Sequence, residues 1–306
     1  MDVCFHIPDF VNHFRLNMLL INSIKDCPEF FRDGIKIASV FGCFGNTLWN
    51  GGRLVGGNTD LITGKKLIEI INIRNVPVRF TFTNPLITDE HLADMTCNQW
   101  LRIANNGFNE VIVVSPVLEE YIRKNYPDYP ITSSTCKQIE TIDGVLDELK
   151  QEYKYVVLDY NLNNKFDMLE KINPDDRSRC EILVNSCCVP GCKRRGEHYR
   201  TIGQNLIDEW KHKKDYLSKK PFEPVPFQCD SMSRTIYDIT EFSTYVSPDD
   251  IYEKYLPMGF NNFKIEGRTA PDVELLDAYL HYMAKPEHKD KLRLKMLLML
   301  TGQKHF

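Results

Sequence analysis

The chain has 306 residues, of which 42% are hydrophobic and 26% are charged, and its formal net charge is −4. This composition is typical of a globular protein and excludes a chain that is basic throughout, so any surface for nucleic acid must be local. No run of about 18 apolar residues exists, and Asp2 and Asp9 stand where a secretory signal needs positive charge and an apolar stretch, so we expect a cytoplasmic protein without a membrane segment.

Short apolar runs alternate with longer helical patterns along the chain, beginning with a helical stretch near residues 13–31. This alternation is typical of βα units and a parallel sheet. Seven or eight such strands favour a TIM-like (β/α) barrel over an open doubly wound sheet. Strands are predicted at residues 36–41, 76–83, 110–115, 129–134, 155–159, 180–185, 244–246 and 262–266.

The predicted strands and helices form one domain over residues 1–306. Residues 187–242 interrupt the alternation of strands and helices after the sixth predicted strand, and they contain a predicted helix near residues 202–216. We therefore interpret this segment as a cysteine-containing insertion at the top of the barrel. Residues 271–306 are predicted to form C-terminal helices that pack on the barrel through an amphipathic run.

The chain has ten cysteines, and four of them gather in the insertion. Cys187, Cys188 and Cys192 lie close together, and Cys229 follows about 36 residues later. The three residues between Cys188 and Cys192 allow two thiolates to reach one metal. Spacing alone leaves open an iron–sulfur cluster, a zinc ion or unligated thiols. Ordinary buried thiols are expected elsewhere, at Cys4, Cys27, Cys97 and Cys136.

A basic stretch that includes Arg194, Arg195 and His198 follows these cysteines directly. Nearby positive charge favours the thiolate, which is the form that binds metal. The same residues can bind an anionic substrate or form a solvated face. A zinc site would take its fourth ligand from Cys187, His198 or Cys43.

Polar side chains also gather where the predicted strands end, and in a barrel these ends meet at one mouth. In the last strand Lys264, Glu266 and Arg268 alternate with other residues, so all three side chains lie on one face. Pointing inward, they either form an ion-pair layer or line a substrate site, and both readings remain open. Other polar residues at strand ends are Asn84, Asp159 and Asn161.

A glycine-rich loop spans residues 42–59 after the first predicted strand. Its spacing matches neither a phosphate-binding P-loop nor a dinucleotide fingerprint. Trp49 can stack on a planar ligand and Arg53 can bind an anion, although either can equally be structural.

Three segments resemble the U32 peptidase (collagenase-like protease) family, and the resemblance covers roughly residues 129–280. They read RCEILVNSCCVPGC, KYVVLDYNLNNKFDMLEKI and TYVSPDDIYEKYLPMGFNNFKIEGR. The resemblance implies a βα barrel and a four-iron four-sulfur cluster held by four cysteines. It also implies closeness to the branch that supports ubiquinone-ring or RNA hydroxylation without molecular oxygen, some members of which act as heterodimers of related barrels.

By this resemblance Cys188, Cys192 and Cys229 match ligand positions, and either Cys187 or Cys43 supplies the fourth ligand. The chain departs from the family pattern at Asn185-Ser186, where the family usually has His-Gly, so a possible general base is missing. It departs again in the gap between Cys188 and Cys192, which is shorter than the family's.

We therefore expect an iron–sulfur tailoring or hydroxylation enzyme that acts on an anionic small molecule or RNA. The alternatives are a peptidase and a metal-stabilised accessory subunit without activity of its own. The expected catalytic residues are Glu266, Lys264, Arg268, Asp159 and Asn161, and the expected substrate-binding residues are Asn84, Trp49, Arg53, Arg194 and Arg195.

Overall fold

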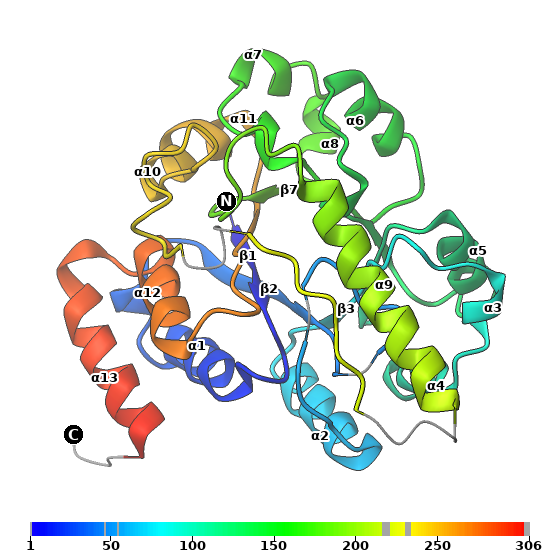
Figure 1. Cartoon of the computed structure of the whole chain (residues 1–306). Helices are drawn as coiled ribbons and strands as arrows, with labels where there is room; N and C mark the ends of the chain where they lie inside the picture. Colours follow the sequence, from blue (N-terminus) through cyan, green and yellow to red (C-terminus); the bar gives the residue numbers. More distant parts are fainter. Residues whose placement is uncertain (1, 46, 54, 216–220, 230–233, 303–306) are drawn as a thin grey trace.

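The structure is a computed structural model that describes all residues except 1, 46, 54, 216–220, 230–233 and 303–306. Eight parallel strands pair in chain order and close into a barrel, because β1 also pairs with β8. Helices surround this barrel (Figure 1). The predicted TIM-like (β/α) barrel is confirmed.

The eight strands are short and mostly buried. The sequence correctly predicts seven of them but misses β1, and its seventh predicted strand is wrong. Residues 244–246 form a turn and an extended segment, in which the Val246 amide donates to the Val184 carbonyl at 3.1 Å. The strands are β1 (Val3–Pro8), β2 (Ile35–Gly42), β3 (Val78–Phe82), β4 (Glu110–Val113), β5 (Ile131–Ser133), β6 (Tyr155–Val157), β7 (Cys180–Leu183) and β8 (Asn262–Lys264).

The helices cover the outer faces of the strands, which explains why the strands read as nearly continuous apolar runs. Among the described residues, no helix is long and apolar enough to span a membrane. The helices are α1 (Phe14–Asp26), α2 (Leu61–Asn72), α3 (Asp89–Leu92), α4 (Met95–Ala104), α5 (Pro116–Asn125), α6 (Ile142–Leu149), α7 (Phe166–Leu169), α8 (Pro174–Arg177), α9 (Arg195–Lys214), α10 (Pro248–Asp250), α11 (Leu256–Met258), α12 (Asp272–Met283) and α13 (Lys289–Thr301).

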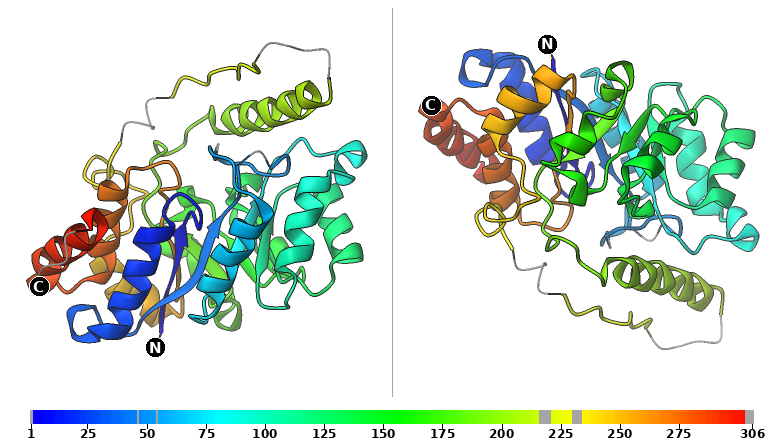
Figure 2. Two further views of the ribbon diagram at one scale, coloured as in Figure 1. Left: turned by 90° about the horizontal axis from the view of Figure 1, so that it is seen from below. Right: turned by 90° about the horizontal axis from the view of Figure 1, so that it is seen from above.

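The longest of these helices, α9, lies across the carboxyl end of the barrel, and its Trp210 contacts the start of α4 (Figure 2). It belongs to the predicted insertion at residues 187–242, of which residues 216–220 and 230–233 lie outside the described part. The helix begins at Arg195, earlier than predicted, directly after the cysteines. At the other side of the molecule α13 packs on α1 and α12 through Leu292 and Met296.

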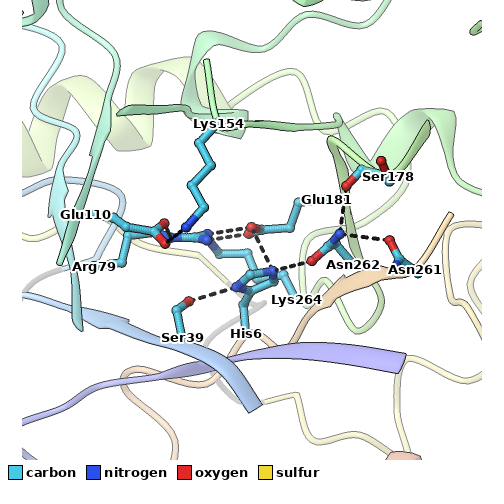
Figure 3. Close-up of polar contacts among 10 residues, drawn as sticks. All are labelled: His6, Ser39, Arg79, Glu110, Lys154, Ser178, Glu181, Asn261, Asn262 and Lys264. Carbon is cyan, nitrogen blue, oxygen red and sulfur yellow. Dashed lines mark hydrogen bonds and ion pairs between the residues drawn. The ribbon is translucent and has the colours of Figure 1, made fainter. Parts of the chain in front are cut away.

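The barrel interior contains a layer of charged side chains from four strands (Figure 3). Arg79 donates from Nε to Glu110 Oε2 at 2.8 Å and from Nη1 to Glu181 Oε2 at 2.5 Å. Lys264 donates from Nζ to Glu181 Oε1 at 2.9 Å. All four side chains are buried, and each charge has an opposite partner, as burial of charge requires. Lys264 is therefore paired with β7 rather than with its neighbours in the predicted charged face.

His6 of β1 lies in the same layer. Its presence within the strand explains why β1 is not predicted from the sequence. Its Nδ1 lies 2.7 Å from Ser39 Oγ, and its Nε2 lies 3.1 Å from Asn262 Oδ1 and 3.4 Å from Glu181 Oε2. The ring is completely buried. A titratable residue in the middle of an apolar run hides the strand pattern from the sequence, but here the polar barrel interior accepts it.

Burial of His6 predicts a loss of stability in mild acid. Burial lowers the pKa of His6 to about 4, although Glu181 opposes the shift. The ordinary value is about 6.5, so between pH 6.5 and 4 the unfolded chain binds this proton and the folded chain does not. The free energy of unfolding should therefore fall as the pH drops through this window. Urea unfolding at a series of pH values tests this, and His6→Gln should flatten the slope between pH 6.5 and 4; an unchanged slope would contradict the assignment.

Candidate functional site

A small cavity of about 80 Å³ lies at the carboxyl end of the barrel. Its walls come from loops that follow different strands: Arg53 after β2, Cys136 after β5, Cys188 after β7, and Glu266 and Arg268 after β8. We call this the mouth cavity. Active sites of (β/α) barrels are built from these loops, so the mouth cavity is the candidate site.

Glu266 is held firmly in this cavity. Its Oε1 forms an ion pair with Arg53, and its Oε2 accepts from the Cys187 amide at 3.2 Å. Burial opposes the charge on Arg53, but Glu266 outweighs it, so the pKa of Arg53 is raised. Asn185 accepts from the Glu266 amide at 2.6 Å and donates to its carbonyl at 3.0 Å. Asn185 thus fixes the backbone that carries Glu266.

Arg268 brings an uncompensated positive charge to the mouth cavity. Its Nη1 donates to Thr81 Oγ1 at 2.8 Å and to Asn50 Oδ1 at 3.2 Å, and its Nη2 donates to the Gly51 carbonyl at 2.8 Å. These acceptors are neutral, and among the described residues no carboxylate lies within ion-pair distance of Arg268. Burial and then Arg53 lower the pKa of Arg268, because both disfavour its charge. An anionic group in the cavity would stabilise the charged form of Arg268.

A second pocket of about 190 Å³ is lined by Cys188, Cys192 and Cys229, and we call it the thiol pocket. Cys188 lines both the thiol pocket and the mouth cavity, so the two adjoin. Cys187 does not line the thiol pocket, although its Sγ lies 3.8 Å from the carbonyl of Arg234, which does. Cys43 is completely buried and lines neither. The structure thus places four of the six candidate ligands around one pocket, namely His198 and the three cysteines that line it.

Burial favours the thiol form of Cys188 over the thiolate. Burial and then Glu266 raise the pKa of Cys188 to about 11, while Arg53 and Arg195 act in the opposite direction. The predicted effect of the basic stretch is therefore outweighed by burial. A metal at this thiol would have to displace its proton, so metal binding should be coupled to proton release.

Two predicted catalytic residues support the cysteine loop instead of lining the mouth cavity. Asp159 forms a buried ion pair with Arg195, the first residue of α9. Asn161 Oδ1 accepts from the Gly191 amide at 2.8 Å, between the two paired cysteines. These contacts position the loop and the start of α9, and they leave Asp159 and Asn161 without a visible role in chemistry.

Some of the predicted substrate-binding residues line a cavity, and others only support the structure around it. Arg53 lines the mouth cavity, and Arg194 lines the thiol pocket with its guanidinium 4.6 Å from the Phe227 ring. Asn84 donates to the carbonyls of Leu48 and Gly203 and so ties the β2–α2 loop to α9.

Trp49 lies apart from both cavities. It is completely buried, and its Nε1 donates to the His91 carbonyl at 2.9 Å, so its ring is not available to stack on a ligand. Cys136, by contrast, lines the mouth cavity although it was expected to be an ordinary buried thiol. Its position at the end of a predicted strand, after Ser133-Ser134, is the signal that could have identified it.

Comparison with known proteins finds one similar sequence and one similar solved structure. No family model matches the sequence. Over 183 residues the chain is 23% identical to an uncharacterized protease of Methanocaldococcus jannaschii, and the aligned region covers 59% of this chain and 52% of that protein. The chain thus spans about half the length of this relative.

The fold is similar to the solved structure of the U32 peptidase Mk0906, with a TM-score of 0.51 and 12% identity over 89% of this chain and 95% of that one. This likeness shows the barrel fold, and the names of both similar proteins agree with the resemblance of the three sequence segments to the U32 peptidase family.

Proposed function

We propose that this protein is an iron–sulfur-dependent tailoring enzyme that acts on an anionic substrate at the mouth of the barrel. One observation carries the proposal: Cys188 lines both the thiol pocket and the mouth cavity. A cluster bound by Cys188, Cys192 and Cys229 would therefore adjoin the cavity in which Arg53 and Arg268 concentrate positive charge.

We propose a cluster rather than a zinc ion, because the resemblance to the U32 peptidase family implies one. A single zinc ion needs its sulfur ligands about 2.3 Å away in a tetrahedron, whereas a four-iron cluster is larger and separates its thiolates further. Among the described residues, no group of three His, Cys, Asp or Glu side chains is close enough to hold a single ion. Cys188, Cys192 and Cys229 line a pocket of about 190 Å³, where such a cluster would lie. Cys187, next in the chain to Cys188, is the nearest candidate for the fourth ligand.

The chain's own groups supply binding and orientation. A bound cluster would supply electrons. Arg268 offers an anionic substrate group a charge that no described carboxylate neutralises, and Arg53 can exchange its contact with Glu266 for one with the substrate. The cavity volume of about 80 Å³ is far below the 300–1,000 Å³ of typical ligand sites, so it accepts an anionic head group rather than a whole nucleotide. Tyr199 of α9 is buried and also lines the cavity.

Cysteine variants test the ligand set. In protein purified without oxygen we expect the broad visible absorption of an iron–sulfur cluster, and Cys188→Ser, Cys192→Ser and Cys229→Ser should each lose most of it, because thiolates hold such clusters. Cys4→Ser is the matched control, since Cys4 begins β1 at the opposite end of the barrel. Cys187→Ser and Cys43→Ser identify the fourth ligand. Absorption that survives in all three pocket variants would contradict the proposal.

A peptidase is the second candidate, because both similar proteins are named as a protease or peptidase. His6 does contact both Ser39 and Glu181, as the histidine of a hydrolytic triad contacts its partners. All three are completely buried inside the barrel, so no peptide can reach them. Casein turnover by metal-free protein that is lost in Glu266→Ala would favour this function over the first.

A further inference from the structure

A separate cavity of about 420 Å³ lies outside the barrel, between the start of α2, helix α4 and helix α9. Its volume falls within the range of small-molecule sites, and its lining shares no residue with the mouth cavity or the thiol pocket. Trp100 of α4 and Trp210 of α9 form part of its wall, together with Leu206. We call it the tryptophan cavity.

Trp100 carries a hydrogen-bond donor for which the described part of the chain supplies no acceptor. The side chain is 2% exposed, and its Nε1 has no acceptor in the structure. The other two tryptophans donate normally, Trp49 to the His91 carbonyl and Trp210 to Asp94 Oδ2 at 2.9 Å. A buried donor without an acceptor costs about 1–3 kcal/mol, so an acceptor atom supplied by a ligand would be favoured here.

The position of Trp100 is fixed by its neighbours. Its ring stacks on Phe44 with the centroids 3.7 Å apart, and a Cβ atom at Gly64 would come within 2.4 Å of it. Gly64 thus allows α2 to pack directly against the indole. Phe44 and α2 therefore hold the indole ring in a fixed position.

The charged residues of the tryptophan cavity are mainly acidic. Among the described residues that line it, Asp60, Asp94 and Glu209 are acidic and Lys213, which pairs with Glu209 at 2.7 Å, is basic. Lys214 lies close by, with its Nζ 3.3 Å from the centre of the Trp210 ring. The two aspartates are held in place as the N-caps of α2 and α4. Their fixed carboxylates favour a cationic ligand and disfavour phosphates and carboxylates.

We propose that the tryptophan cavity binds a small aromatic or heteroaromatic cation. Its flat body would pack against Trp100 and Trp210, its acceptor atom would take the Trp100 N–H, and its ammonium group would lie near Glu209 and Asp94. The site is independent of the mouth cavity, whose excess charge is positive. The two sites therefore select ligands of opposite charge.

Saturation-transfer NMR on the full chain tests the site with a matched pair of probes. Tyramine carries a phenol oxygen and an ammonium group, and 3-(4-hydroxyphenyl)propionate carries the same phenol with a carboxylate. We expect saturable binding of tyramine at millimolar or lower concentration and binding of the carboxylate about tenfold weaker or absent. Glu209→Gln and Trp100→Phe should each weaken tyramine binding several-fold, because one removes the charge and the other the donor.

Glu253→Gln, on an exposed residue far along the chain, is the matched control and should leave binding unchanged. Glu209 is partly exposed, so Glu209→Gln should fold normally even if Trp100→Phe does not. Absence of tyramine binding, equal binding of both probes, or tyramine binding that Glu209→Gln does not weaken would each overturn the proposal. None of these results bears on the cluster or on the mouth cavity.

Discussion

Replacing Glu181 by glutamine is expected to lower the free energy of unfolding by about 3–5 kcal/mol, a large part of the 5–15 kcal/mol of a typical domain. Glu181 is completely buried and contacts Arg79, Lys264 and His6 from three other strands. The substitution leaves positive charge in the barrel interior without its partner. Urea unfolding at neutral pH measures the loss.

Two further variants show whether the effect arises from the buried charge. Glu69→Gln removes a carboxylate whose pair with Lys65 is more than half exposed, and it should change stability little. Adding Lys264→Met to Glu181→Gln should recover part of the loss, because it removes a charge that has become unpaired. A Glu181→Gln protein as stable as Glu69→Gln would show that the charged layer does not hold the barrel together.

Replacing Arg268 by glutamine is expected to weaken anion binding at the mouth cavity by about 10–100-fold. Hydrogen bonds to a charged group contribute about 1.5–3 kcal/mol, and 1.4 kcal/mol corresponds to tenfold in affinity. Inorganic phosphate serves as the probe, since an ion that binds the folded chain raises its melting temperature. The wild type should show this rise, and Arg268→Gln should lose it.

Arg102→Gln provides the control for this experiment, because Arg102 is exposed on α4 and lies outside the mouth cavity. It should retain the response to phosphate. If Arg268→Gln responds as strongly as the wild type, the uncompensated guanidinium is not the anion site. If the wild type itself does not respond, the mouth cavity does not bind free anions and the proposed substrate class loses its support.

The fold could be predicted from the sequence because most strands are apolar runs bounded by turn residues. β1 could not, because His6 interrupts it and the residues that accept this histidine, Ser39 and Asn262, lie on other strands. At residues 244–246 the sequence predicts a strand that the structure does not contain. This short run makes one backbone hydrogen bond to Val184 and does not pair as a strand of the sheet.

The candidate site was predicted only in part, because the sequence shows which residues end strands but not what they contact. Glu266, Arg53 and Cys188 do meet at the mouth cavity. Asn185 was interpreted as the loss of a base, whereas its side chain clamps the Glu266 backbone. Trp49 was expected to meet a ligand, but it is buried with its N–H on the His91 carbonyl, 42 residues away in the sequence.

The central claim is that the cysteines beside the mouth cavity hold an iron–sulfur cluster. Iron, zinc and acid-labile sulfide measured in one anaerobic preparation of the full chain test it most directly. The account predicts about four irons and four sulfides per chain and no stoichiometric zinc. A colourless protein without iron or sulfide that carries one zinc per chain would contradict it.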